Sequence, residues 1–292
     1  MSGFVRLDGP DPYELFGAQF RRSRFALQTA YDEAFAAWDR RCELLKEHQW
    51  SSGYGGMEIP WLSAVGAETR TLPQVTLDRM WDDALAENVQ ADSQASIVLL
   101  VADDALQRFA RGLLGNERRA EGYGPTYGAP YKGLVKFTRL LRAGANAIRH
   151  VSEWDDLPWR DYYPWPVGGN VYPPLDYCKQ LEREARAALD ECVDPDKRKA
   201  ADARWRTVAS MCRAMESIDI FQRVFGIGVN SPIRDPVSFH IITAVDGRLG
   251  HGTSYLHFEA AMLTAARDIA TQRGPEAAAK LEEQLAEPDP DD

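Results

Sequence analysis

Residues 92–114 read DSQASIVLLVADDALQRFARGLL, and their spacing predicts a long amphipathic helix. The apolar residues recur at steps of three and four, which places them on one helical face. We expect that face to be the core-facing one, made of Ile97, Leu100, Val101, Leu106, Phe109 and Leu113. Asp92 suits the N-cap position, and Gly115 is typical of the position after a last turn. This helix must pack against others to bury its apolar face.

Most of the remaining chain has the same helical spacing. Further helices are predicted over 11–49, 75–88, 132–154, 178–192, 196–225 and 255–285. Ser254 suits the N-cap of the last helix. Only Val237–Val245 is β-branched and apolar, and the turn-forming Asp246–Gly247 follows, so we expect a short β-hairpin near 237–250. The predicted fold class is mostly α: a helical bundle forming a single domain over 1–285, with an acidic tail at 286–292.

Composition narrows the class of protein. The chain has 292 residues, of which 45% are hydrophobic, enough to build a core. No apolar run approaches the roughly 18–20 residues of a membrane span, and the N-terminus does not resemble a signal peptide. Four isolated cysteines (Cys42, Cys178, Cys192 and Cys212) form no C-x-x-C pair. We therefore expect a reduced, cytoplasmic protein that does not associate with membranes.

The charge is unevenly distributed along the chain. Of the formal net charge of −10, residues 276–292 contribute −6, from seven acidic residues and one lysine. The terminal segment is therefore a solvated face or an interaction arm. The rest of the chain is only mildly acidic, so net charge does not exclude an RNA ligand.

The segment GLVKFTRLLRAGANAIRHVSEWDD, residues 133–156, carries the strongest chemical signal. On a helix, its apolar residues form a buried stripe of Leu134, Phe137, Leu141, Gly144, Ile148 and Val151. The opposite side holds Arg139, Arg142, Asn146, Arg149 and His150. Arg142, Asn146 and His150 are spaced i, i+4, i+8, so their side chains line up.

This polar face has the groups needed for metal-independent RNA cleavage. A histidine can move protons near neutral pH, and an arginine can stabilise charge on phosphate oxygens. Asn146 would orient the histidine or the phosphate. The same residues also suit an ordinary solvated basic face.

Asn146-x-x-x-His150, within a helix of a mostly helical chain, resembles the motif of the HEPN superfamily. That motif is an arginine, a polar residue (often asparagine), three variable residues and a histidine. The resemblance implies a HEPN-like core near 92–156, a homodimer with the motif at a shared cleft, and an endoribonuclease of a bacterial toxin–antitoxin or phage-defence system. Ala145 occupies the arginine position, so Arg142 or Arg149 would take that role. The alternative is a catalytically inactive HEPN relative or a non-enzymatic protein-interaction module.

Two further features bear on this site. Asp103 and Asp104 lie on the 92–114 helix, where they either pair with Arg142 or Arg149 or stay exposed. The aromatic and proline-rich segment 154–177 either forms a stacking platform for bases or fastens a long loop across the bundle.

No cofactor and no metal site is predicted. Gly226-x-Gly228 lacks the third glycine of a dinucleotide fingerprint and does not follow a strand. The spacing of His251, His257 and Glu259, with His240 nearby, matches no standard set of metal ligands.

Overall fold

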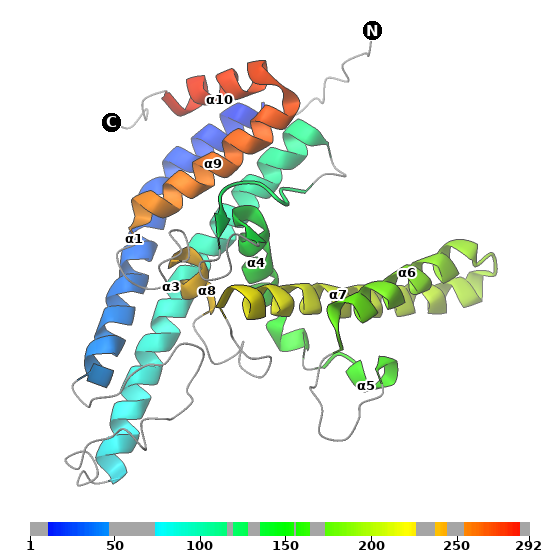
Figure 1. The fold of residues 1–292 in the computed structure, drawn as a ribbon, viewed down its shortest axis with the longest axis horizontal. Coiled ribbons are helices and arrows are strands. Elements are labelled where there is room, and N and C mark those ends of the chain that lie inside the picture. Colours follow the sequence, from blue (N-terminus) through cyan, green and yellow to red (C-terminus); the bar gives the residue numbers. More distant parts are fainter. Residues whose placement is uncertain are drawn as a thin grey trace.

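The computed structural model describes residues 11–46, 74–115, 119–127, 135–154, 156–163, 173–225, 237–243 and 254–286, and these are mostly α-helical (Figure 1). The helices are α1 (Pro12–Lys46), α3 (Gln74–Leu114), α4 (Phe137–Trp154), α5 (Trp159–Tyr162), α6 (Leu175–Glu191), α7 (Pro195–Phe225), α8 (Val237–Thr243), α9 (Tyr255–Arg273) and α10 (Pro275–Ala286). Strands β1 (Thr126–Tyr127) and β2 (Val135–Lys136) pair antiparallel. The predicted mostly α fold class is confirmed.

The long helices α1 and α3 run in opposite directions along each other (Figure 1). Near one end of the pair, the ring centroids of Phe16 and Phe109 lie 4.7 Å apart. Near the other end, Arg40 forms an ion pair with Glu87 at 2.9 Å. This pair of helices is the largest helix–helix interface among the described residues, and it forms one side of the core.

Helix α3 continues through Asp92, so the prediction of separate helices over 75–88 and 92–114 is wrong. Asp92 caps a different helix, because its carboxylate accepts the backbone N–H of Ser238 at the start of α8, at 2.7 Å. Of the predicted core face, Leu106, Phe109 and Leu113 are buried as expected, and Leu100 and Val101 are partly buried against the core. The prediction is wrong at Ile97. Ile97 is 49% exposed, whereas Val98 and Leu99 are fully buried.

The segment 237–243 is the helix α8, so the predicted β-hairpin is wrong there; residues 244–250 lie outside the described residues. Phe239, Ile241 and Ile242 are all fully buried. A short apolar run buried on all sides has no periodicity that separates strand from helix. Ser96 also hydrogen-bonds Ser238 between their hydroxyls at 2.9 Å, so α3 supplies polar contacts that hold the start of α8.

The predicted last helix over 255–285 is divided into α9 and α10. Gly274 has a φ of +128°, and Pro275 follows it, so the chain turns between the two helices. Arg267 of α9 binds Glu282 of α10 through two N–H···O contacts of 2.5 and 3.1 Å. Ser254 precedes α9 as predicted, and its backbone N–H donates to Nδ1 of His257 at 3.2 Å. The predicted tail beyond Ala286 lies outside the described residues.

Helices α6 and α7 form a hairpin that extends away from the α1–α3 pair (Figure 1). The bounds of α6 and α7 differ by at most three residues from those of the predicted helices 178–192 and 196–225. Helix α7 packs on α4, and its second half contributes Met211, Ile218 and Phe221 to the buried core. The first half of α7 contacts α6 and is largely exposed. The hairpin is therefore anchored to the body at one end only.

The tight turn before α4 depends on a glycine. Gly124 has a φ of +83°, and a Cβ at this position would lie 3.0 Å from Cβ of Phe137 and 3.1 Å from Cβ of Ala265. Its N–H donates to the Asp268 carboxylate at 3.0 Å. We expect Gly124→Ala to lower the free energy of unfolding by about 2–3 kcal/mol, measured in urea.

Gly122 is the matched control, because its φ is +76° but a Cβ there would have no neighbour within 4 Å. Gly122→Ala should lower the free energy of unfolding by only about 1 kcal/mol, because alanine disfavours the left-handed backbone conformation. Equal losses in the two variants would show that the contacts with Phe137 and Ala265 do not constrain Gly124.

The histidine of α8 makes the stability of the fold depend on pH. Burial, with the charge of Arg41, lowers the pKa of His240 from 6.5 to about 4. The folded state favours the neutral ring, so stability is complete above about pH 6.5 and falls as the pH drops towards 4. The loss approaches about 3 kcal/mol. Urea unfolding at a series of pH values should show this fall, and it should be shallower in His240→Gln. The same slope in both proteins would contradict the assignment, and His150→Gln serves as the surface-histidine control.

Candidate functional site

The position of α4 is set at its first residues. The loop before β1 and the first turn of α4 exchange hydrogen bonds: Tyr123 N–H donates to the Thr138 hydroxyl at 3.0 Å, and Thr138 N–H donates to the Tyr123 carbonyl at 3.2 Å. Phe137 N–H donates to the carbonyl of Pro125 at 2.9 Å. These contacts fix where α4 begins and hence which of its sides faces the core.

Gly144 lets α4 pass close to α3 and α8. A Cβ at this position would lie 2.6 Å from Cδ1 of Leu99 and 2.5 Å from Cδ1 of Ile241. Phe137 and Leu141 are buried on the same side, as the sequence predicted. Leu134 lies outside the described residues, as does the side chain of Val151, and Ile148 is only half-buried. The close approach at Gly144 brings the polar residues of α4 within reach of α3.

The predicted polar face of α4 is present. Arg139 and Arg149 are exposed, while Arg142, Asn146 and His150 are partly buried. Ala145, which stands at the arginine position of the HEPN pattern, is fully buried. An arginine at 145 would point into the core, so in this chain only the neighbouring positions present a guanidinium on the polar face.

Asp103 of α3 holds two of these arginines together. Its side chain is 2% exposed, and Oδ2 lies 3.1 Å from Nη1 of Arg142 and 3.3 Å from Nη1 of Arg149. Of the two carboxylates left open by the sequence, Asp103 is therefore the partner. Asp104 is exposed enough to pair along its own helix with Arg108, at 2.8 Å. The Asp103 cluster, defined as Asp103, Arg142 and Arg149, carries a net charge of +1.

A second residue of α3 extends the Asp103 cluster. Nε2 of Gln107 lies 3.5 Å from Oδ1 of Asp103, and Oε1 of Gln107 accepts the N–H of Ala120 at 3.2 Å. Both polar side chains are buried, so each needs such partners. The cluster is thus tied to the loop that leads into α4.

His150 lies one residue beyond Arg149 and contacts a carboxylate of its own helix. Nδ1 of His150 is 3.1 Å from Oε2 of Glu153, and the two side chains are 45% and 65% exposed. When Nδ1 carries the proton of this contact, Nε2 keeps a lone pair that can accept another proton. Sequence reasoning missed Glu153, although its i, i+3 spacing from His150 would have indicated the pair.

Asn146 lies between Arg142 and His150 on the polar face, one turn from each. Among the described residues it makes no side-chain hydrogen bond to His150 or to either arginine. The structure therefore brings Arg142 and Arg149 together through Asp103, and leaves Asn146 beside them without joining that network.

The aromatic segment after α4 fastens the chain where the structure describes it. Trp154 and Trp159 are both buried, and the indole N–H of Trp159 donates to the carbonyl of Trp154 at 2.7 Å. The Tyr177 hydroxyl donates to the carbonyl of Tyr162 at 2.8 Å. These rings hold the connection between α4 and α6 in place. The described part of the segment therefore fastens a loop, which was one of its two predicted roles. Residues 164–172 lie outside the described residues.

The described part of the chain contains no group of three or more His, Cys, Asp or Glu side chains that could hold a metal ion. His257 and Glu259 belong to α9, and Glu259 binds Arg24 of α1 at 2.6 Å. His251, Gly226 and Gly228 lie outside the described residues. None of the described helices has the length and apolarity required to cross a membrane.

Removal of the shared carboxylate tests the strength of the Asp103 cluster. Asp103→Ala leaves the partly buried guanidinium of Arg142 next to that of the exposed Arg149 with no counter-charge, so we expect the free energy of unfolding to fall by about 2–3 kcal/mol. Asp104→Ala removes a more exposed ion pair and should cost less than about 1 kcal/mol. Urea unfolding of both variants gives the comparison. Similar small losses would mean that Asp103 does not hold α4 on α3.

No family model, no curated protein and no solved structure matches this chain. Its function must therefore be inferred from its own residues and contacts.

Proposed function

We propose that this protein is a HEPN-like, metal-independent endoribonuclease and that the polar face of α4 is its active site. One observation carries the proposal: Arg142 and Arg149 converge on a single oxygen of Asp103, and His150 directly follows Arg149 on the same helix. Two phosphate-binding groups and one proton-transfer group therefore share one surface. Proton transfer and stabilisation of charge on the phosphate are the two contributions that RNA cleavage without a metal can use.

The proposed chemistry begins with the 2′-hydroxyl of the RNA. Nε2 of His150 takes the hydroxyl proton, and the 2′-oxygen attacks the adjacent phosphorus. The bond from phosphorus to the 5′-oxygen breaks, and the protonated His150 gives its proton to that leaving oxygen. The products are a 2′,3′-cyclic phosphate and a 5′-hydroxyl, so atoms and protons balance.

The arginines stabilise the negative charge that builds up on the phosphate oxygens during this step. Each guanidinium has five N–H donors, and only its Nη1 donates to Asp103. Other N–H groups therefore remain to bind a phosphate. The side chains of Arg142 and Arg149 are 27% and 37% exposed, which leaves them accessible from solvent. Asp103 then acts as a positioning residue, because it holds both groups in place without touching the substrate.

The resemblance of Asn146-x-x-x-His150 to the HEPN motif indicates the biological setting. A HEPN-like ribonuclease of this kind would work in the cytoplasm as a homodimer, within a bacterial toxin–antitoxin or phage-defence system. The burial of Ala145 means that the phosphate contact must come from Arg142 or Arg149. Asn146 would orient the phosphate between them and His150.

A second function is a non-enzymatic protein-interaction module, or a catalytically inactive relative of the same fold. Two observations favour it. The Asp103 cluster also serves as a structural link between α3 and α4, and large apolar side chains lie on the surface, Phe25 at 81% exposed and Leu256 at 64%. Such side chains are available to contact a partner protein.

Cleavage of single-stranded RNA by the full chain in EDTA distinguishes the two functions. We expect His150→Ala to slow cleavage by at least about 100-fold, because it removes the proton-transfer group. His257→Ala is the control for loss of an exposed histidine elsewhere, and it should cleave as fast as the wild type. The products should end in a 2′,3′-cyclic phosphate.

The enzyme assignment fails if the wild type leaves all tested RNAs intact, or if His150→Ala cleaves as fast as the wild type. An interaction module would give that result and would bind its partner equally well with and without His150.

A further inference from the structure

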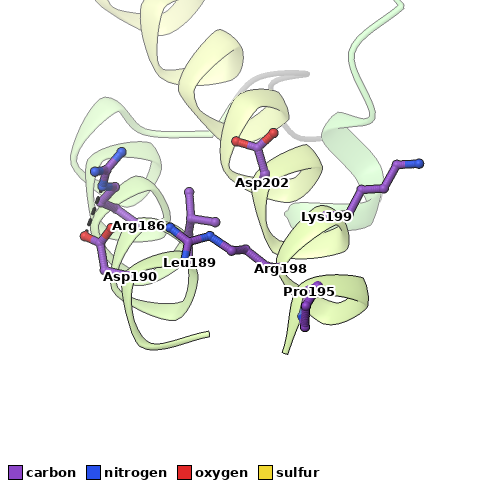
Figure 2. Close-up of a pocket in the computed structure, with 7 residues that line it drawn as sticks. All are labelled: Arg186, Leu189, Asp190, Pro195, Arg198, Lys199 and Asp202. Carbon is purple, nitrogen blue, oxygen red and sulfur yellow. Dashed lines mark hydrogen bonds and ion pairs between the residues drawn. The ribbon is translucent and has the colours of Figure 1, made fainter. Parts of the chain in front are cut away.

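A charged groove lies near the closed end of the α6–α7 hairpin, separate from the polar face of α4 (Figures 1 and 2). Its volume is about 410 Å³. Residues of both helices line it: Arg186, Leu189, Asp190, Pro195, Arg198, Lys199 and Asp202. This volume falls within the range of small-molecule sites, and it is too large for a single phosphate ion.

The acidic residues of the groove already have partners. Asp190 accepts a hydrogen bond from Nε of Arg186 at 3.0 Å, and Asp202 pairs with Arg206 at 2.9 Å. Arg198 and Lys199 form no ion pair within the part of the chain that the structure describes. The groove therefore has positive charge that the protein itself does not neutralise.

One side chain of the groove crosses from one helix towards the other. Figure 2 shows Arg198 reaching from α7 towards α6, beside Leu189, whereas Lys199 points away from α6. Arg186 also lies over the ring of Trp205, 5.1 Å from its centroid, which limits its movement. Two guanidinium groups thus border one space, and the apolar side chain of Leu189 forms part of its wall.

The backbone N–H groups at the start of α7 do not supply the binding groups. The carboxylate of Asp194 accepts the N–H of Asp196 at 3.0 Å and that of Lys197 at 3.4 Å, so first-turn donors are occupied. An anion in the groove would therefore be held by arginine side chains rather than by backbone N–H groups.

We propose that this groove binds a small phosphorylated molecule of nucleotide size. Arg198 and the free Nη atoms of Arg186 hold the phosphate, because the planar guanidinium donates two parallel hydrogen bonds to phosphate oxygens. The carboxylates of Asp190 and Asp202 accept hydrogen bonds from the hydroxyl groups of a sugar. Leu189 contacts the apolar part of the ligand. This site is independent of the ribonuclease proposed on α4.

Calorimetric titration of the full chain with ATP, with inorganic tripolyphosphate and with ribose tests the proposal. We expect ATP to bind more tightly than tripolyphosphate, and ribose alone to give no measurable heat. Arg198→Ala should weaken ATP binding by at least about tenfold, and Arg198→Lys should weaken it less, because lysine keeps the charge but not the planar group. Circular dichroism confirms that each variant keeps its helices.

Arg204→Ala is the matched control, since Arg204 is an exposed arginine of the same helix outside the groove. It should bind ATP as the wild type does. The proposal is overturned if ATP gives no heat at millimolar concentration, if tripolyphosphate binds as tightly as ATP, or if Arg198→Ala and Arg204→Ala lose affinity equally. RNA cleavage should proceed at the same rate in the wild type and in Arg198→Ala. A failure of the ATP-binding test can therefore be told apart from a failure of the proposed ribonuclease.

Discussion

A buried carboxylate needs a counter-charge, and this requirement joins the two helices that form the candidate site. Asp103 is almost fully buried on α3, and its partners Arg142 and Arg149 lie on α4. The two helices can meet there because Gly144 presents no Cβ to Leu99. Since removal of one partner leaves an unpaired charge at the interface, the cluster favours the same rotation of α4 about its axis as the hydrogen bonds at its first turn. The same rotation determines which side chains of α4 face solvent.

Helix α3 also positions α8 through a buried carboxylate. Its Asp92 accepts the first-turn N–H of α8, and burial raises the pKa of that carboxyl group while the hydrogen bonds from α8 oppose the increase. One long helix therefore uses two acidic residues to place two neighbouring helices. Polar groups within an otherwise apolar interface favour one arrangement over nearby ones, because any shift leaves them unpaired.

Local signals in the sequence were enough to predict which segments are helical, because helical spacing acts over a few positions. The Ser254 N-cap and the polar face of α4 were predictable for the same reason. These signals did not predict that α3 continues through Asp92 or that the chain turns between α9 and α10. Asp92 was wrongly predicted to begin a helix, because the sequence does not distinguish an N-cap residue of its own helix from one that caps a neighbouring helix. The segment 237–243 was predicted as a strand because its apolar residues Phe239, Ile241 and Ile242 are all buried, and such a short run lacks a periodicity that separates strand from helix. The pairing of Asp103, rather than Asp104, depends on the packing of α3 against α4, and the groove on α6 and α7 depends on two helices meeting.

The central claim is that RNA contacts the chain at the polar face of α4. Nuclear magnetic resonance of the full protein, with labelled histidine and arginine side chains, tests it with an RNA whose 2′-hydroxyls are methylated and which therefore cannot be cleaved by the proposed route. The account predicts that the signals of His150, Arg142 and Arg149 shift together as RNA is added, while that of the buried His240 does not. Shifts confined to other residues, with these three unchanged at saturating RNA, would contradict it.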